Sequence, residues 1–500
     1  TKPAASTHDE VSRVHFVINT YSDCNISRRF TLASSHTPMK YLITLLAFIF
    51  LIGCNGEKSN VAPPDGPIEE AATEEVATET NPIEAVSVNP NFKYKIEGDE
   101  VTITGTSKRP SNYLIIPKII EGKPVTSIGE SAFVFHSRLK SITIPDGVTS
   151  IGDKAFNGRR LLTSITIPDS VTSIGDGAFK TCIYLTGITI PNGVTRIGNE
   201  AFRNCESLKS ITIPDDVTSI GDEAFYNCQS LTSMTIGNSV TSIGEKAFFL
   251  CRRLTSITIP DSVTNIGDDA FYGCDGLTSI TIGNGVTSIG DAAFYGFKSM
   301  TTIEVSAGNV NYTVVEGVLF NRGKTLLNTY PAGKAGANYN IPDSVTSIGD
   351  GAFYNCESLT SITIPDSVTS IGEGSFVLCS SLTSITIPDS VTSIGPVAFA
   401  SCTSLTSITI PDGVTSIGPV AFAKCSNLKS ITIGNGVTSI GEVAFRKCDS
   451  LTAVTFLGDA PEIANDAFGG SSPTIYRKAD AKGWGDTLAG RPVKLITEKP

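Results

Sequence analysis

A unit of 23 residues repeats along most of the chain, and a phenylalanine stands at the same place in every copy. A typical copy, residues 361–383, reads SITIPDSVTSIGEGSFVLCSSLT. The 14 copies have this phenylalanine at Phe133, Phe156, Phe179, Phe202, Phe225, Phe248, Phe271, Phe294, Phe353, Phe376, Phe399, Phe422, Phe445 and Phe468. A fixed period in the twenties predicts a repeat solenoid, in which each turn contacts mainly its two neighbours. Such a fold favours a protein that binds through a surface over one that does chemistry in a pocket.

Each unit is predicted to contain a short strand, a Pro-Asp turn, a second extended piece and one turn of helix. Between Ser384 and Ile387, alternation points the isoleucines inward and the serine and threonine outward. We expect left-handed backbone at Gly395, because glycine adopts it without strain. An acidic residue follows this glycine in most copies, as Asp350 does, and we expect it to cap the helical turn.

The repeats occupy residues 125–456, and both ends need covers because a solenoid otherwise exposes open strand edges. We predict an N-terminal cap at residues 91–124. Residues 457–500 are predicted to form a degenerate last repeat and a C-terminal cap, which holds Trp484, the single tryptophan.

An irregular repeat at about residues 300–341 interrupts the period. Two β-prone runs flank residues 321–324 (NRGK), so we predict a hairpin there. We expect the hairpin to replace the helical turn of one repeat and to project from the convex side. It serves either as a spacer that breaks the register or as a contact for a specific partner.

The N-terminal part differs from the repeats. We expect residues 1–38, which precede Met39, to have no role in the mature protein. Residues 39–53 have the layout of an export signal, with a basic start and an apolar core too short for a membrane span, which needs roughly 20 residues. LIGC at residues 51–54 resembles the lipobox of bacterial lipoproteins. That resemblance implies cleavage before Cys54 and lipid attachment to this cysteine.

A linker is predicted to follow the lipidated cysteine, at residues 54–90. Eight acidic residues, one lysine and no aromatic residue lie between positions 55 and 90. Such a segment buries too little apolar surface to offset the entropy lost on ordering, so we expect it to be disordered.

The repeat LTSITIPDSVTSIGEGSFVLCSS and the irregular unit GVLFNRGKTLLNTYPAGK resemble the BspA-like (Treponema-type) leucine-rich repeats of bacterial surface proteins. Leu382, Ile385 and Ile387 have the L-x-x-I-x-I spacing of a leucine-rich-repeat strand. The resemblance covers about residues 91–500. It implies a right-handed leucine-rich-repeat β/α superhelix, with parallel strands stacked every 23 residues, displayed at the cell surface. It also implies macromolecular ligands, since some members bind host matrix or plasma proteins.

An outward row of threonines is the candidate binding face. Its members are Thr166, Thr189, Thr212, Thr235, Thr258, Thr281, Thr363, Thr386, Thr409 and Thr432. We interpret the row as a surface for proteins or glycans, with β-propensity on a solvated sheet face as the alternative. The positions around the repeated cysteine, such as Arg252 and Arg253, vary most between copies and form a second candidate face.

Ten cysteines recur at one position of the repeat, in two blocks of five. They are Cys182, Cys205, Cys228, Cys251, Cys274, Cys356, Cys379, Cys402, Cys425 and Cys448. An exported protein permits disulfides, and neighbouring rungs could lie within bonding range. Because each block has an odd number, we predict buried free thiols that pack as small apolar groups. Metal ligands would converge on a point rather than follow a line, so no metal is predicted.

An aspartate or asparagine follows the strand in most copies, from Asp146 to Asn435. Both residue types favour turns, which explains the row. Calcium binding by stacked carboxylates is the alternative.

Composition and motifs restrict the function. Residues 1–54 carry +2 and residues 55–90 carry −7 of the total charge of −11, which leaves −6 for residues 91–500. This nearly neutral body lacks the basic face that nucleic acid requires. After Met39 the chain contains one histidine, His136, and none of the common hydrolase or phosphate-binding motifs.

We therefore predict a non-enzymatic cell-surface protein without a cofactor. It is anchored to the bacterial envelope through lipid at Cys54, and it binds extracellular or envelope proteins or glycans. A structural envelope protein that self-associates or binds cell-wall polymer is the alternative.

Overall fold

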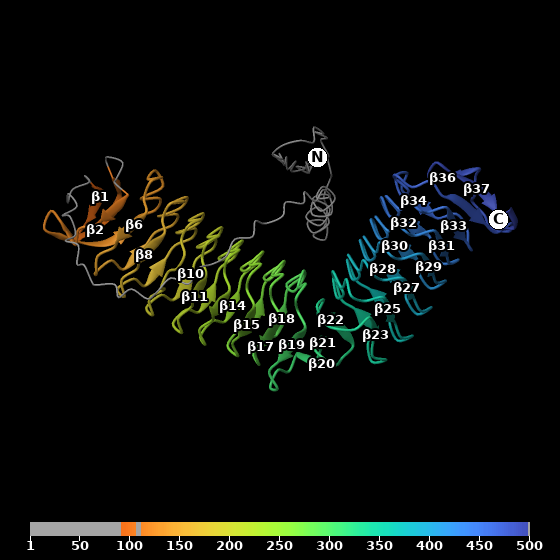
Figure 1. Ribbon diagram of the computed structural model, residues 1–500, viewed down its shortest axis with the longest axis horizontal. Helices are drawn as coiled ribbons and strands as arrows, with labels where there is room; N and C mark the ends of the chain where they lie inside the picture. The colour runs from red at the N-terminus through yellow and green to blue at the C-terminus, as the bar shows by residue number, and fades with distance from the viewer. Residues whose placement is uncertain (1–91, 107–111, 499–500) are drawn as a thin grey trace, which may run out of the picture. The chain divides into compact units, whose positions relative to one another are not determined.

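The computed structural model describes residues 92–106 and 112–498 (Figure 1). The predicted signal, the lipidation site Cys54 and the acidic linker lie outside these residues. Within them, no segment forms a helix with the length and apolar character that crossing a bilayer requires.

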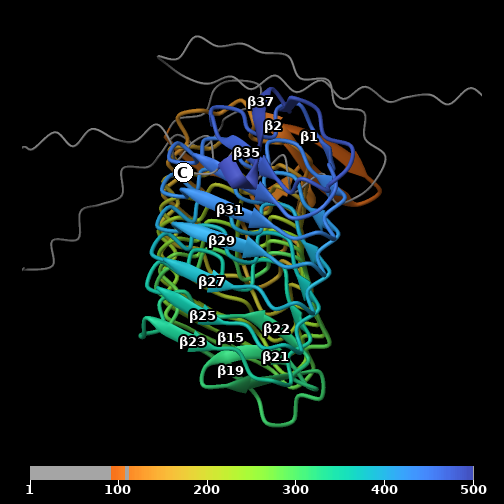
Figure 2. The ribbon, with the colours of Figure 1, turned by 90° about the vertical axis from the view of Figure 1, so that its right-hand side faces the viewer.

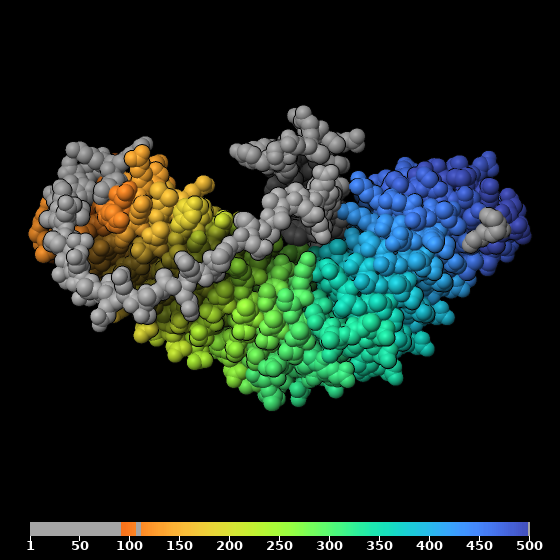
Figure 3. Space-filling model, viewed as in Figure 1, coloured from red at the N-terminus to blue at the C-terminus, as the bar shows by residue number. Residues whose placement is uncertain are grey.

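Each turn of the solenoid contributes two short strands, and equivalent strands of successive turns pair in parallel (Figures 1 and 2). Register partners are 23 residues apart, as Ile257 and Ile280 are. The predicted parallel stacking of the repeats is thus confirmed. In Figure 3 the colours pass in order from turn to turn, because no repeat crosses back over another.

We call the strands with the Ser-Ile-Thr sequence the first ladder. They are β3 (Tyr113–Ile115), β6 (Ser141–Thr143), β8 (Ser164–Thr166), β11 (Ser210–Thr212), β13 (Ser233–Thr235), β15 (Ser256–Ile259), β17 (Ser279–Ile282), β19 (Thr302–Val305), β23 (Asn338–Asn340), β25 (Ser361–Thr363), β27 (Ser384–Thr386), β29 (Ser407–Ile410), β31 (Ser430–Ile433), β33 (Ala453–Phe456) and β35 (Thr474–Arg477). The first ladder is divided into several short sheets.

The second ladder is made of the shorter strands that follow the Pro-Asp turn. They are β5 (Lys123–Ile128), β7 (Ser150–Ile151), β9 (Ser173–Ile174), β10 (Arg196–Ile197), β12 (Ser219–Ile220), β14 (Ser242–Ile243), β16 (Asn265–Ile266), β18 (Ser288–Ile289), β22 (Leu326–Thr329), β24 (Ser347–Ile348), β26 (Ser370–Ile371), β28 (Ser393–Ile394), β30 (Ser416–Ile417), β32 (Ser439–Ile440) and β34 (Glu462–Ile463). The second ladder stops once, after β18.

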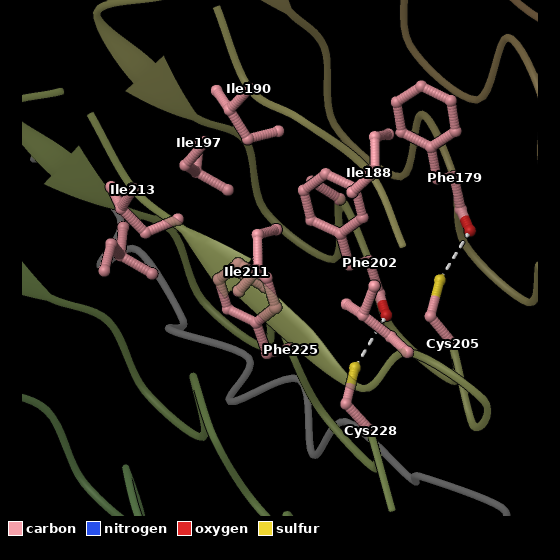
Figure 4. Close-up of a cluster of buried hydrophobic side chains, with 14 of the residues drawn as sticks. Phe179, Ile188, Ile190, Ile197, Phe202, Cys205, Ile211, Ile213, Phe225 and Cys228 are labelled. Carbon is pink, nitrogen blue, oxygen red and sulfur yellow. Dashed lines mark hydrogen bonds between the residues drawn. The ribbon is translucent and has the colours of Figure 1, made fainter. Parts of the chain in front are cut away.

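The core lies between the two ladders and the third side of each turn (Figure 4). The repeated phenylalanines stack along it, with ring centroids of Phe179 and Phe202 5.4 Å apart and those of Phe202 and Phe225 5.3 Å apart. The inward isoleucines, such as Ile211, are also buried. A single turn has no partner for either face of these side chains, so the core exists only in the stack.

The third side of each turn is not helical, which corrects the prediction. The single helix among the described residues is a 3₁₀ turn at Ile496–Glu498 (η2). Two residues in most third sides have positive φ, as Glu200 (55°) and Asn204 (59°) do, whereas a helix needs φ near −63°. Alternate peptide N–H groups bond to the next turn instead, and those between them form short bonds within the turn. The N–H of Phe179, for example, donates to the carbonyl of Ala201 at 2.8 Å.

The roles predicted for the glycine and the acidic residue after the second ladder are also wrong. Gly395 does not have positive φ, whereas Val397, two residues later, does (50°). The glycine position is restricted by the neighbouring turn, because a Cβ at Gly175 would lie 2.6 Å from the backbone nitrogen of Asp153. The carboxylate of Asp153 caps no helix. It accepts a hydrogen bond from the N–H of Asp176 in the next turn, at 2.8 Å.

The interruption contains two hairpins, where one was predicted. β20 (Tyr312–Val315) pairs antiparallel with β21 (Val318–Asn321), and β21 pairs antiparallel with β22. The hairpin around residues 321–324 is confirmed, and the β20–β21 hairpin was missed. Neither replaces the third side of a turn, because β22 takes a place in the second ladder and pairs with β24.

Strand β21 separates two hydrophobic cores. Leu319 packs in the core formed by the preceding repeats, whereas Val318 and Phe320 pack in the core formed by the following repeats. Successive side chains of a strand point to opposite faces, so one buried strand serves both cores. All three side chains are fully buried.

Antiparallel strands lie at both ends of the solenoid. β1 (Phe92–Glu97) pairs with β2 (Glu100–Thr106), and β4 (Ile119–Ile120) pairs with β5. At the other end, β36 (Thr487–Leu488) pairs with β37 (Arg491–Leu495), which continues the first ladder beyond β35. Trp484 packs edge-on against Phe456, with ring centroids 5.1 Å apart.

Replacing one ring of the phenylalanine stack should weaken the whole repeat array. We expect Phe225→Ala to lower the free energy of unfolding by about 3–5 kcal/mol, because the ring is fully buried between two others. Phe135→Ala is the control, since Phe135 is 85% exposed. Urea unfolding followed by circular dichroism measures both. Equal losses in the two variants would contradict the stacking argument.

Candidate binding surface

The ten threonines predicted as a binding face follow one line along the first ladder. We call them the outer threonine row: Thr166, Thr189, Thr212, Thr235, Thr258, Thr281, Thr363, Thr386, Thr409 and Thr432. Neighbours pair in register, as Thr212 does with Thr235 and Thr409 with Thr432. Eight side chains are exposed, and Thr281 and Thr432 are half-buried. Thr189 lies outside a strand, because this turn joins the ladder only through a bridge between Ser164 and Gly187.

Two other threonine rows have their hydroxyls engaged in the fold. The threonine just before each strand donates to a backbone carbonyl of the preceding turn, as Thr172 does to Thr149 and Thr255 to Thr232. We call them the clamping threonines. In the first ladder they are Thr163, Thr186, Thr232, Thr255, Thr278, Thr301, Thr360, Thr383 and Thr452. In the second ladder they are Thr149, Thr172, Thr218, Thr241, Thr264, Thr287, Thr346, Thr369, Thr392, Thr415 and Thr438.

The outer threonine row differs because its hydroxyls are uncommitted. The hydroxyl of Thr281 donates to the carboxylate of Glu304 at 3.3 Å, and no other hydroxyl of the row has a hydrogen-bond partner among the described residues. Each free hydroxyl keeps one donor and two acceptor positions for a ligand. The side chain points outward from the first ladder, at or near the end of its strand, and donates to no carbonyl of the neighbouring turn.

The outer threonine row has two blocks. Glu304 on β19 and Asn340 on β23 take the threonine position between Thr281 and Thr363. At the N-terminal end the same position holds Ile115, which is 51% exposed. The continuous parts of the row therefore lie on either side of the interruption.

The Asp/Asn row beside the outer threonines serves the turns. The carboxylate of Asp215 accepts a hydrogen bond from the N–H of Asn238 at 2.7 Å, and Asp412 accepts one from Asn435 at 2.8 Å. These bonds tie each turn to the next. In residues 92–106 and 112–498, no three acidic, histidine or cysteine side chains converge to hold a metal ion.

The ten repeated cysteines are free and buried, as predicted. Most of the thiols donate to a phenylalanine carbonyl of the preceding turn, as Cys205 does to Phe179 at 3.2 Å and Cys228 to Phe202 at 3.2 Å (Figure 4). Burial raises the pKa of the Cys182 thiol to about 12. Such thiols are poor nucleophiles because the reactive species is the thiolate.

The last repeat explains what the cysteine position requires. Ser471 stands there, and its hydroxyl donates to the carbonyl of Phe445 at 2.8 Å. A small side chain with one donor therefore fits the site. The sequence shows that the residue is small, but only the stacked structure shows which carbonyl accepts its hydrogen bond.

His136 takes the cysteine position in the first repeat and is buried. Its Nε2 forms a hydrogen bond with Oγ1 of Thr106 at 2.9 Å. Burial lowers its pKa, and the nearby Arg159 guanidinium lowers it further. No carboxylate orients the ring and no nucleophile faces it among the described contacts, so it lacks the partners of a general base.

Comparison with known proteins identifies the family. The chain matches the BspA type leucine-rich repeat region, in six copies, at residues 112–232, 218–322 and 337–474. The chain belongs to the BspA-type leucine-rich-repeat family. The resemblance seen in the repeat sequence is thus confirmed.

Solved structures of similar proteins agree with this assignment. A leucine rich cell surface protein of Faecalibacterium prausnitzii is 34% identical, with 74% of this chain and 93% of that protein covered and a TM-score of 0.61. A leucine-rich repeat protein of Bacteroides ovatus is 31% identical, with 74% and 94% covered and a TM-score of 0.52. No curated protein matches this BspA-type chain.

The buried thiols generate a direct prediction. In the folded protein at pH 8, the ten repeat cysteines should not react with a thiol reagent, because burial blocks access and raises their pKa. In urea without reductant, all ten should react. Fewer reactive thiols in the denatured protein would show that disulfides form along the column.

Proposed function

We propose that this BspA-type protein is exported, displayed at the cell surface and binds proteins or glycans there through the outer threonine row. The observation that carries the proposal is the difference between the threonine rows: two are engaged in the fold, and one has free hydroxyls. The Faecalibacterium relative, described as a cell surface protein, supports the location. The proposed role is non-enzymatic, consistent with the buried thiols and with a histidine that lacks a carboxylate or nucleophile beside it.

Binding through this row is spread over many turns. One neutral hydrogen bond contributes about 1 kcal/mol, so a useful affinity needs several rungs at once. The rungs are about 4.8 Å apart, the spacing of neighbouring strands. An extended ligand with regularly repeated polar groups, a polypeptide segment or a linear glycan, suits such an array.

The first test compares two sets of matched threonine substitutions. We expect Thr212→Val, Thr235→Val and Thr258→Val together to weaken binding at least tenfold without changing stability, since these hydroxyls have no partner among the residues that the structure describes. The probes are immobilised extracellular matrix proteins and purified envelope polysaccharide. Valine preserves the shape and the β-propensity of threonine, so the strands should remain intact.

The clamping threonines of the second ladder provide the control. Thr218→Val, Thr241→Val and Thr264→Val remove three hydroxyls that donate to carbonyls of preceding turns at 3.0–3.1 Å. We expect this variant to lose about 1 kcal/mol of stability per site and to keep its binding. Unchanged binding in the outer-row variant would exclude the outer threonine row. Self-association of the wild type without binding to either probe would favour a structural envelope role.

We also propose lipid anchoring at Cys54, which rests on the LIGC sequence. Wild-type protein expressed in a bacterial host should partition into the detergent phase, and Cys54→Ala should partition into the aqueous phase. A Cys182→Ala variant controls for the loss of a cysteine in general. Aqueous partition of the wild type would contradict the anchor.

A further inference from the structure

The turn that carries Phe294 and the turn that carries Phe353 are poorly joined on the third side. Elsewhere the phenylalanine N–H bonds to the alanine carbonyl of the next turn, as Phe271 does to Ala293 at 3.0 Å. Phe294 donates no such bond among the described contacts. The N–H of Tyr330 donates to the carbonyl of Ala352 at 2.7 Å, and its ring stacks on Phe353 with centroids 5.2 Å apart, so Tyr330 takes the phenylalanine place in an irregular turn between those of Phe294 and Phe353. We call the boundary between the Phe294 and Phe353 turns, which this irregular turn spans, the seam.

Both ladders also stop at the seam. The sheet that contains β18 ends there, a new sheet starts at β20, and β19 does not pair with β23. The two hydrophobic cores meet there across β21. Backbone hydrogen bonds across it include those from Ile303 N–H to Gly317 O (3.2 Å) and from Gly333 N–H to Met300 O (2.8 Å). The seam therefore lacks both the second-ladder pairing and the phenylalanine N–H bond that join neighbouring repeats elsewhere.

Aromatic side chains hold the third side together at this point. The rings of Tyr295 and Tyr354 stack with centroids 5.2 Å apart. The hydroxyls of Tyr272 and Tyr354 form a hydrogen bond at 3.2 Å across the seam. Gly351 lies against the ring of Tyr295, and a Cβ there would overlap the ring. The seam is thus closed by side chains where other boundaries use peptide groups.

Four carboxylates from both sides of the seam act on the hydroxyl of Tyr295. Asp269 and Asp291 come from the preceding turns, and Asp350 and Glu373 come from the following turns. Gly351, next to Asp350, lies against the Tyr295 ring, and the N–H of Glu373 donates to the Asp350 carboxylate at 2.7 Å. After burial, these four negative charges raise the pKa of the Tyr295 hydroxyl. Like charges thus face one another across a boundary with few bonds.

The cations near this cluster neutralise it only in part. Lys246 faces Asp269, with its Nζ 3.5 Å from the carboxylate, and Glu245 and Asp268 lie near the same group. Arg252 and Lys298 face Asp275, which in turn faces Tyr272 and Tyr354. The charges that act most on Glu373 are two carboxylates, Asp350 and Asp291.

The carboxylates respond to this crowding by holding protons more strongly. Burial, then Asp350 and Asp291, raise the pKa of Glu373 to about 7. Burial raises the pKa of Asp269 to about 6, although Lys246 opposes the shift. The pKa values of Asp291 and Asp350 are also raised, with burial as the first cause in each.

We propose that the seam is a pH-responsive joint between two blocks of the solenoid, closed when the carboxylates around Tyr295 are partly protonated and loosened when all are ionised. In the open state these groups regain ordinary acidity, so closing takes up protons. The closed state therefore becomes more stable relative to the open state as pH falls from about 7 towards 4.5, the ordinary pKa of glutamate. It becomes less stable as pH rises through that range. The outer threonine blocks lie on opposite sides of the joint. If that row binds ligands, the joint also controls the alignment of its two halves, but the joint does not depend on that function.

Hydrogen exchange of the full chain, resolved by mass spectrometry, tests the joint without any ligand. After correction for the intrinsic exchange rate, peptides that contain Tyr295 and Tyr354 should open about tenfold more at pH 8 than at pH 5.5. A tenfold change corresponds to about one pH unit. This is less than the full rise in the pKa of Glu373, because solvent screens the partly exposed carboxylate. Peptides around Phe202, within a continuous block, should show no such change.

Glu373→Gln should abolish most of the pH dependence, leaving less than a twofold change, because the amide resembles the protonated acid. Glu442→Gln is the matched control, since Glu442 has the same position in a repeat away from the seam. Asp291→Asn is a second variant at the joint and should act like Glu373→Gln. Gly351→Ala should open the seam at every pH because of its overlap with Tyr295. Wild-type seam peptides without pH dependence, or equal effects of the Glu373 and Glu442 variants, would overturn the proposal.

Discussion

The hydrogen bond between the peptide groups of one turn and those of the next is the interaction on which the rest of this structure depends. No turn bonds its own backbone into a helix, and no turn has enough apolar neighbours to bury its own phenylalanine. Each 23-residue unit therefore obtains both its backbone partners and its core from adjacent units. Such a chain gains stability by stacking, and its ends need antiparallel strands to finish the open edges.

Close stacking decides which residue types the repeat accepts. The glycine after the second ladder is required because the neighbouring backbone leaves no room for a Cβ. Cysteine, or serine at Ser471, fits where a phenylalanine carbonyl of the preceding turn needs a donor. The hydroxyl of the threonine before each strand donates a hydrogen bond to a carbonyl of the preceding turn. Polar residues that look in the sequence like an ordinary solvent-exposed surface thus stabilise the contacts between turns.

Sequence reasoning was reliable where a residue type has one physical role and unreliable where it has several. The period of Phe133 to Phe468, the inward isoleucines and the free cysteines follow from periodicity and apolar character alone. The third side was mistaken for a helix because residues such as Lys246 and Leu250 give no hint that they adopt positive φ. Gly395 was predicted to need the backbone freedom of glycine, although the close approach of the preceding turn is what excludes a side chain there.

The same ambiguity applies to the candidate site. Three threonine rows share one composition and one exposure to solvent, and only the geometry of neighbouring carbonyls separates the clamping threonines from the outer threonine row. The sequence identified the outer row by its position in the strand, but it could not show that its hydroxyls are uncommitted. The β20–β21 hairpin was missed because Glu316-Gly317 is a short turn between two runs that read as one strand. The acidic cluster around Tyr295 had no sequence signal at all, since Asp291 and Asp350 are 59 residues apart and act on one another only because of how the irregular turn folds between them.

In a repeat array with identical boundaries, every boundary between turns has the same stability, so none of them opens in preference to another. The interruption breaks that equivalence at one place. Strand β21 packs one face against each of two cores. The regular backbone hydrogen bonds between turns are interrupted there, and tyrosine rings and carboxylates lie at the boundary instead. Local opening in a stacked protein starts where the coupling between neighbours is weakest. The irregular repeat is therefore the position in the described solenoid where we expect the pH of the solvent to influence how the two blocks of the surface are aligned.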